Sequence, residues 1–178
     1  MAAAYVRAMF LKPGPTEAVP PDRAQEAREQ FIARMGQHFE LDGLPRIAGR
    51  LMALMILEGQ PISFGDLARR LNVSRGSIST NARLLESKGM IERLSHPGER
   101  QDYFQLTATP CANLIDGIRE RMLRTAEDVE TLVAELPSTT DERRRLCRTR
   151  DFFTIMADAL GEAAERLGRA DSEGGTGR

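Results

Sequence analysis

The sequence predicts a mainly α-helical fold that carries one small β-hairpin. Three observations support this fold class. Apolar residues recur at helical spacing before residue 90 and again after residue 109, which indicates amphipathic helices on both sides of the hairpin. Residues 90–95 and 100–106 have the composition of two short strands around a Pro-Gly turn. Ser63 and Ser74 stand at the starts of two short helical segments, where a hydroxyl side chain caps a helix.

The first part of the chain is predicted to contain an arm and two helices. Residues 1–20 combine prolines and a glycine with no clear periodicity, and we expect a flexible arm. A helix is then predicted from Pro21, because apolar residues recur every four positions at Ala27, Phe31, Met35 and Phe39. A second helix is predicted from Pro45, which suits a first turn, to Gly59.

Residues 63–106 predict two short helices joined by a tight turn and followed by the hairpin. Ser63 caps the first helix with Asp66 three residues on, and Ser74 caps the second after a turn at Asn72. This is the order of elements in a winged helix-turn-helix, which we expect to span residues 21–106 with its leading helices. Because two strands alone are marginally stable, the hairpin must pack on the helices.

The C-terminal part predicts two longer helices that pair with a second copy. One begins at Thr109-Pro110 and runs to about Leu136, and the other begins near Thr139 or Thr140. The broad apolar face of the last helix consists of Phe152, Phe153, Met156, Ala159, Leu160, Ala163 and Leu167. Two helices packed only on each other cannot bury this much apolar surface, so we expect residues 107–168 to form a homodimer. Residues 169–178 are expected to be a disordered tail.

The outer face of the second short helix predicts contact with double-stranded DNA. Arginines and short hydroxyl side chains bond base edges and phosphates, and Gly76 removes bulk where a phosphate would approach the helix start. The predicted contacts on this helix are Ser74, Arg75, Gly76, Ser77, Ser79, Thr80, Asn81 and Arg83. The predicted contacts in the hairpin are Arg93, His96 and Arg100, with His96 and Arg100 reaching a minor groove. The alternatives are a solvated face that binds nothing, and a winged helix that serves protein assembly without sequence-specific DNA binding.

The charge distribution agrees weakly with DNA binding. The whole chain has a net charge of −1, but residues 63–106 carry +2 and residues 107–178 carry −3. A local positive field can attract DNA while the rest of the molecule stays acidic. A difference this small also fits an uninformative fluctuation of composition.

Several function classes are disfavoured by the sequence. Hydrophobic residues make up 41% of the chain, but no apolar run reaches the length of a membrane span and no signal-peptide pattern is present. We therefore expect a cytoplasmic protein without a membrane partner. No nucleophile elbow, phosphate-binding glycine loop or carboxylate pair stands out, and the cysteines and histidines lack metal-ligand spacing. We expect neither enzyme activity nor a cofactor nor a metal.

Two weaker patterns suggest control of the protein. Met35, Met52, Met55 and Met122 fall on helical faces and could line an apolar pocket for a small-molecule effector, although plain core is the commoner role of such residues. Cys111 and Cys147 could act as thiol redox switches, and an inert thiol is again the commoner reading.

Three spaced motifs resemble the GbsR-like branch of the MarR-type transcriptional regulators. They are Leu44-Pro45-Arg46-x-x-Gly49-Arg50, then Ser74-Arg75-Gly76-Ser77-Ile78-Ser79, then Pro97-Gly98-Glu99-Arg100-x-Asp102-Tyr103. The resemblance implies a homodimeric repressor or activator on a pseudo-palindromic operator, with repression expected, and DNA contacts from Arg75, Ser77, Thr80, Arg83 and Arg100. Some members of that branch respond to choline or related osmolytes. This chain has no tryptophan and two tyrosines for the aromatic cage that a quaternary ammonium prefers, so the sequence does not favour such a ligand.

Overall fold

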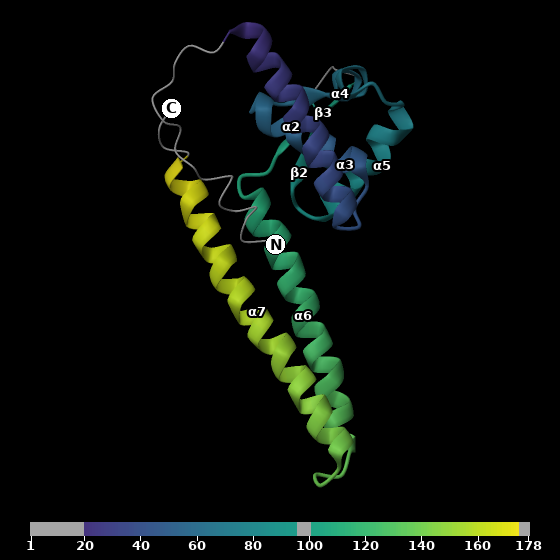
Figure 1. Ribbon diagram of the computed structural model, residues 1–178, viewed down its shortest axis with the longest axis vertical. Coiled ribbons are helices and arrows are strands. Elements are labelled where there is room, and N and C mark those ends of the chain that lie inside the picture. Colours follow the sequence, from purple (N-terminus) through teal and green to yellow (C-terminus); the bar gives the residue numbers. More distant parts are fainter. Residues whose placement is uncertain (1–19, 96–100, 175–178) are drawn as a thin grey trace.

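The chain consists of a head and a long helical hairpin that extends away from it (Figure 1). The computed structural model describes residues 20–95 and 101–174. The head comprises residues 21–95 and 101–106, and the hairpin comprises α6 (Pro110–Glu135) and α7 (Asp141–Gly174). Among the described residues, no helix combines the length and apolar character that a membrane span requires.

Two helices lead into the head and approach each other closely. They are α2 (Pro21–Leu41) and α3 (Arg46–Glu58). A Cβ atom added to Gly49 would lie 2.4 Å from the carbonyl oxygen of Met35, so the two backbones meet at a distance that only glycine permits. The predicted stop of α3 at Gly59 is confirmed, since Gly59 adopts a left-handed φ of 63°.

The helix-turn-helix follows, and both predicted serine caps are confirmed. Its helices are α4 (Phe64–Leu71) and α5 (Arg75–Ser87). The backbone N–H of Asp66 donates to Ser63 Oγ over 3.1 Å. The backbone N–H of Ser77 donates to Ser74 Oγ over the same distance. Asn72 forms the turn between the helices with a φ of 51°, which its short polar side chain tolerates.

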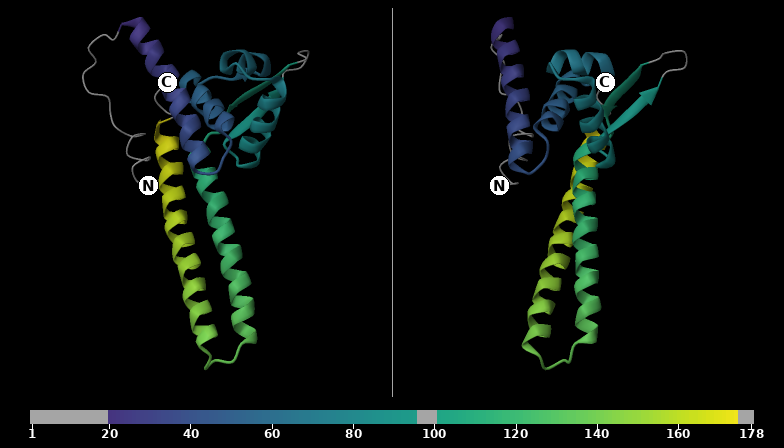
Figure 2. Two further views of the ribbon diagram at one scale, coloured as in Figure 1. Left: turned by 45° about the vertical axis from the view of Figure 1, so that its right-hand side comes forward. Right: turned by 90° about the vertical axis from the view of Figure 1, so that its right-hand side faces the viewer.

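The two strands of the β-hairpin, here called the wing, belong to a three-stranded antiparallel sheet. Its strands are β1 (Ile62–Ser63), β2 (Ile91–Ser95) and β3 (Asp102–Leu106), in the order β1-β3-β2. The sequence prediction missed β1, because two residues are too few to show an alternating pattern. Ile62 pairs with Phe104, which is fully buried, so the added strand ties the wing to the core. Figure 2 shows the wing projecting from the side of the head opposite α2.

The core of the head is built from large aliphatic and aromatic side chains. α3 lies at its centre, where residues 51–55 are all buried. The largest fully buried side chains of the head are Leu51, Met55, Leu67, Leu71, Ile78, Leu85 and Phe104. These residues come from α3, α4, α5 and β3, so the core fixes α5 and the wing on one scaffold.

The helical hairpin buries small residues and exposes large ones. Its buried residues are Ala112, Ala126, Val133, Ala157 and Ala164. The apolar face predicted for the last helix divides into two: Phe153 and Leu160 are half-buried, whereas Phe152 and Met156 are exposed. α7 also continues to Gly174, so the prediction that the helix gives way to a disordered tail after residue 168 is wrong for residues 169–174. Predictions for residues 1–19 and 175–178 lie outside the described residues.

A polar cluster joins the helical hairpin to the end of α5. Asn113, in the first turn of α6, donates from Nδ2 to the carbonyl oxygen of Gly89 over 2.6 Å and to Thr107 Oγ1 over 3.2 Å. The Thr107 hydroxyl donates to the same Gly89 oxygen over 2.8 Å. Gly89 follows the end of α5 with a φ of 64°. The start of α6 is therefore hydrogen-bonded to the chain that terminates α5.

Candidate nucleic-acid interface

Helix α5 presents a polar, partly cationic surface along its exposed side. Arg75, Gly76, Thr80 and Arg83 are exposed, and Ser77 and Ser79 are half-buried. Ser74 caps the helix: its hydroxyl oxygen accepts from the backbone N–H of Ser77 and lies 2.9 Å from the Ser77 hydroxyl. Seven of the eight positions predicted on this helix thus lie at or beside one accessible face, and Ser74 and Ser77 also hold its first turn together.

Gly76 leaves open space beside the start of α5. A Cβ atom added there would meet no atom closer than Ser74 Oγ at 3.8 Å, and its φ needs no glycine. Internal packing therefore does not explain a glycine at this position. Because glycine has no side chain, a phosphate could approach the backbone at the N-terminus of α5.

Asn81 does not belong to this exposed face. Its side chain is 6% exposed, and its Nδ2 donates to the Ser77 carbonyl oxygen over 2.8 Å. Its Oδ1 is buried and has no hydrogen-bond partner among the described residues. The prediction that Asn81 lies on the outer face is wrong. Helical spacing turns position 81 toward the core beside Ile78 and Leu85. The prediction failed because a polar residue is ordinarily expected on the exposed face of a helix.

Arg93 is held by neighbours inside the head. Its guanidinium lies 3.5 Å from a carboxylate oxygen of Glu86 on α5 and 3.4 Å from one of Asp102 on β3. Its Cζ also lies 5.3 Å from the centroid of the Phe104 ring. These contacts fasten the wing to the recognition helix, so Arg93 has a structural use besides its predicted contact with DNA. The other two predicted wing contacts, His96 and Arg100, lie outside the described residues.

A shallow hollow of about 360 Å³ separates the start of α5 from the start of β3. It is lined by Phe64, Arg75, Gly76, Ser79, Gln101 and Asp102. The guanidinium of Arg75 lies over the ring of Phe64, with Cζ 5.0 Å from the ring centroid. The sequence reasoning missed Phe64, although it opens the i, i+3, i+4, i+7 stripe that continues through Leu67 and Leu71.

An ion pair secures the first helix of the helix-turn-helix. Arg70 of α4 donates to the carboxylate of Glu58, the last residue of α3. The hydrogen bond from Arg70 holds the pKa of Glu58 below its ordinary value, and partial burial opposes this shift. Arg50 adds a second tie, donating to the carbonyl oxygen of Leu71 over 2.7 Å. α4 and, through the turn, α5 are thereby oriented on α3.

The four methionines predicted to line an effector pocket do not come together. Met52 and Met55 are buried in the core of the head, and Met35 packs against it. Met122 lies on α6, outside that cluster. In this single chain the head therefore packs three of the four in or against its core, and the effector pocket stays a prediction. Cys111 and Cys147 are half-buried, and no group of metal-ligating side chains occurs in the described chain.

Comparisons with known proteins agree with this geometry. The family model described as the MarR family matches residues 42–102. The HTH-type transcriptional regulator MmpR5 of Mycobacterium tuberculosis is 38% identical over 151 residues, which cover 80% of this chain and 90% of that protein. A solved crystal structure of a transcriptional regulator matches with a TM-score of 0.67 and 31% identity, covering 80% of this chain and 99% of that one. Both likenesses extend beyond the head into the helical hairpin.

Proposed function

Because this chain belongs to the MarR family of winged helix-turn-helix transcriptional regulators, we propose that it regulates transcription by binding double-stranded DNA as a homodimer. The observation that carries the proposal is the exposed side of α5. The exposed side chains there are Arg75, Thr80 and Arg83, and Gly76 lies among them without a side chain. The opposite side of the helix packs in the core. Phosphate contacts would supply affinity and register, and contacts with base edges would supply specificity.

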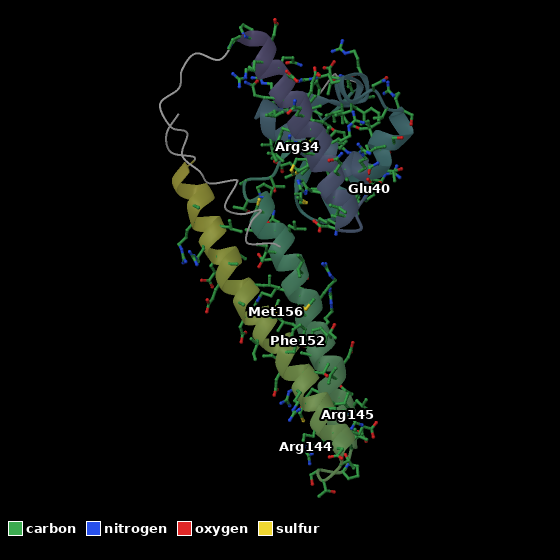
Figure 3. The ribbon with its side chains drawn as sticks, in the orientation of Figure 1. Arg34, Glu40, Arg144, Arg145, Phe152 and Met156 are labelled. Carbon is green, nitrogen blue, oxygen red and sulfur yellow. The ribbon has the colours of Figure 1, made fainter. Side chains whose placement is uncertain are left out.

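The exposed apolar residues of the hairpin support the homodimer. Phe152 is 56% exposed and Ile155 is 66% exposed, and both lie on α7 with Met156. Figure 3 shows Phe152 and Met156 midway along α7, away from Arg144 and Arg145 near the turn. Soluble proteins rarely leave such a patch on a helix without a partner. A second copy offers the same face, as a two-fold interface requires.

The sequence motifs support further proposals about the mode of regulation, the branch of the family and the location of the protein. We propose repression at a pseudo-palindromic operator, membership of the GbsR-like branch, and action in the cytoplasm, where the operator lies. The family consists of transcriptional regulators rather than enzymes. An apolar effector would act by changing the spacing of the two recognition helices, which must match one turn of DNA, about 34 Å. A thermal-shift screen that finds no stabilising compound would count against such an effector.

Protein assembly without DNA is the second candidate function. A winged helix used in this way would present an apolar outer face on α5 to its partner. The exposed residues of α5 are polar or cationic instead, and the large exposed apolar residues of α7 lie on the hairpin. The observed distribution favours DNA at the head and protein at the hairpin.

Fluorescence anisotropy tests the proposal. Purified protein is titrated onto DNA from upstream of its own gene and onto scrambled DNA, across a series of salt concentrations. We expect tighter binding to the upstream DNA and a steep loss of affinity with salt. Arg75→Ala and Arg83→Ala should each weaken binding by about 1–3 kcal/mol if they contact bases.

Arg144→Ala is the matched control, since Arg144 is an exposed arginine near the far end of the hairpin. It should leave affinity unchanged. Weak and equal binding to both DNAs would contradict regulation from this upstream site. A DNA library selection that also enriches no sequence would leave protein assembly as the function.

A further inference from the structure

We propose that Phe64 is a positioning residue that holds the guanidinium of Arg75 in place for contact with DNA. The proposal rests on the proposed DNA-binding function and assigns a role to a residue outside the recognition helix. Phe64 is the first residue of α4, and Arg75 is the first residue of α5. The turn between the two helices brings the ring and the cation together.

The contact has the geometry of a cation–π interaction. Arg75 Cζ lies 5.0 Å from the centroid of the Phe64 ring, within the range of about 6 Å where the ring attracts a cation. Phe64 is half-buried and packs against the core, so the ring is held from behind. Its centroid lies 6.2 Å from that of Phe104, a fully buried residue of β3. The cation therefore lies over a ring that packs against the core.

This way of holding an arginine leaves its hydrogen-bonding groups available. A guanidinium carries five N–H donors, and a cation–π contact pairs none of them with an acceptor oxygen. Arg75 forms no ion pair with any carboxylate in the described ranges 20–95 and 101–174. Arg93 differs, because Glu86 and Asp102 both lie within ion-pair distance of its guanidinium. Arg75 is thus ordered by an aromatic ring while its donors stay free for a base or a phosphate.

Prior ordering of Arg75 should favour binding by reducing an entropic cost. A free arginine side chain loses rotamer freedom when it contacts DNA, and this loss opposes association. A side chain already held on Phe64 loses less. An exposed cation–π contact corresponds to about a two- to fivefold change in affinity for each protomer. If two protomers bind one operator, the factors multiply to roughly four- to 25-fold.

The experiment combines a binding cycle with a direct measurement of the contact. Operator affinity is measured for the wild type, Phe64→Leu, Arg75→Ala and the double variant, with full-length protein. Leucine keeps most of the apolar bulk of phenylalanine but has no ring. We expect Phe64→Leu to weaken binding in the wild-type background and to have no further effect when Arg75 is alanine.

Phe64→Tyr is the conservative variant, because it keeps the aromatic face, and we expect it to bind as the wild type does. A loss from Phe64→Leu that persists in the Arg75→Ala background would overturn the proposal, since Phe64 would then act through the fold as a whole. Tighter binding by Phe64→Leu would also overturn it, because the ring would be holding Arg75 away from DNA.

NMR spectroscopy of the free protein separates the contact from the DNA-binding function. The Arg75 side-chain Nε–H signal should show a ring-current shift in the wild type and in Phe64→Tyr, and lose it in Phe64→Leu. If this shift is present but no sequence binds preferentially, the proposed function fails while the contact stands. If the shift is absent from the wild type, the positioning role fails whatever the DNA result.

Discussion

The head and the helical hairpin bury opposite kinds of residue. The head encloses large side chains such as Leu51, Met55 and Phe104, all at most 1% exposed. The hairpin encloses alanines and leaves Phe152 and Ile155 more than half exposed. Small residues let α6 and α7 approach closely but remove little apolar surface from water. The head has a complete core of its own, whereas the hairpin leaves large apolar side chains exposed, on the face proposed to bind a second copy.

This difference assigns the two parts different roles. A rigid, self-sufficient head can hold α5 and the wing in a fixed relation, which a DNA contact requires. A hairpin stabilised by a second copy can set the distance between two such heads. The cluster of Asn113, Thr107 and Gly89 is the described hydrogen-bonded connection through which one part can influence the other.

The largest expected effect comes from placing a charge on the hairpin face. Ile155→Asp should weaken the dimer by about 4 kcal/mol, roughly a thousandfold, because a substitution at a central residue costs about 2 kcal/mol and occurs twice in a symmetric pair. Sedimentation velocity over a range of protein concentrations measures the change. Thr154→Asp, which adds the same charge at an exposed neighbouring position, should leave the dimer intact. Dimers of equal strength in both variants would mean that the exposed face is not the interface.

A substitution at the contact between α2 and α3 should lower the stability of the head. Gly49→Ala forces a Cβ atom against the backbone of Met35, and overpacking of this kind costs about 1–3 kcal/mol. Urea unfolding followed by circular dichroism measures the loss. In Gly117→Ala, on α6, the added Cβ atom would meet only Arg121 Nη1 at 3.9 Å. That control should gain about 0.5–1 kcal/mol from the better helix propensity of alanine. A destabilised Gly117→Ala would show that space at the glycine does not decide the outcome.

Breaking the connection between the two parts should have a smaller effect. Asn113→Ala removes the donor to the Gly89 carbonyl oxygen and should cost about 1–2 kcal/mol of stability. It should also weaken operator binding without changing dimer formation, since it loosens the head relative to the hairpin. Gln105→Ala, which removes an exposed amide that donates to Glu92, should change stability by less than about 0.5 kcal/mol. Unaltered operator affinity in Asn113→Ala would show that the cluster stabilises the fold but does not couple the parts.

The smallest effect concerns the ion pair between α3 and α4. Glu58→Gln should cost about 0.2–1 kcal/mol at neutral pH, because both side chains are partly exposed to solvent. The folded state lowers the pKa of Glu58 below its ordinary value of 4.5, so the pair stabilises the fold above that pH. The advantage of the wild type should then shrink as the pH falls below 4.5 and the carboxylate is protonated. Unfolding midpoints at pH 7 and at lower pH test this, and a difference that does not depend on pH would contradict the pair.

Local signals explain why most of the head could be predicted. Ser63, Ser74 and Gly59 act within a few residues of their own positions, so their capping and stopping roles are visible in sequence order. The apolar residues Leu67, Leu71, Ile78 and Leu85 likewise recur at helical spacing and form the buried faces of α4 and α5. Such features need no knowledge of which element packs on which.

Long-range packing decided the features that the sequence did not reveal. β1 exists only because β3 lies beside it, and the side chain of Asn81 is buried with the apolar stripe of α5 against the core. Phe64 meets Arg75 and Phe104 across three elements, and Met52 and Met55 lie in the core of the head. Periodicity shows that a residue faces inward, but only the three-dimensional arrangement shows what it meets there. Sequence patterns therefore predicted the winged helix-turn-helix and most of its exposed α5 face, while the contacts that hold that face in position came from tertiary packing.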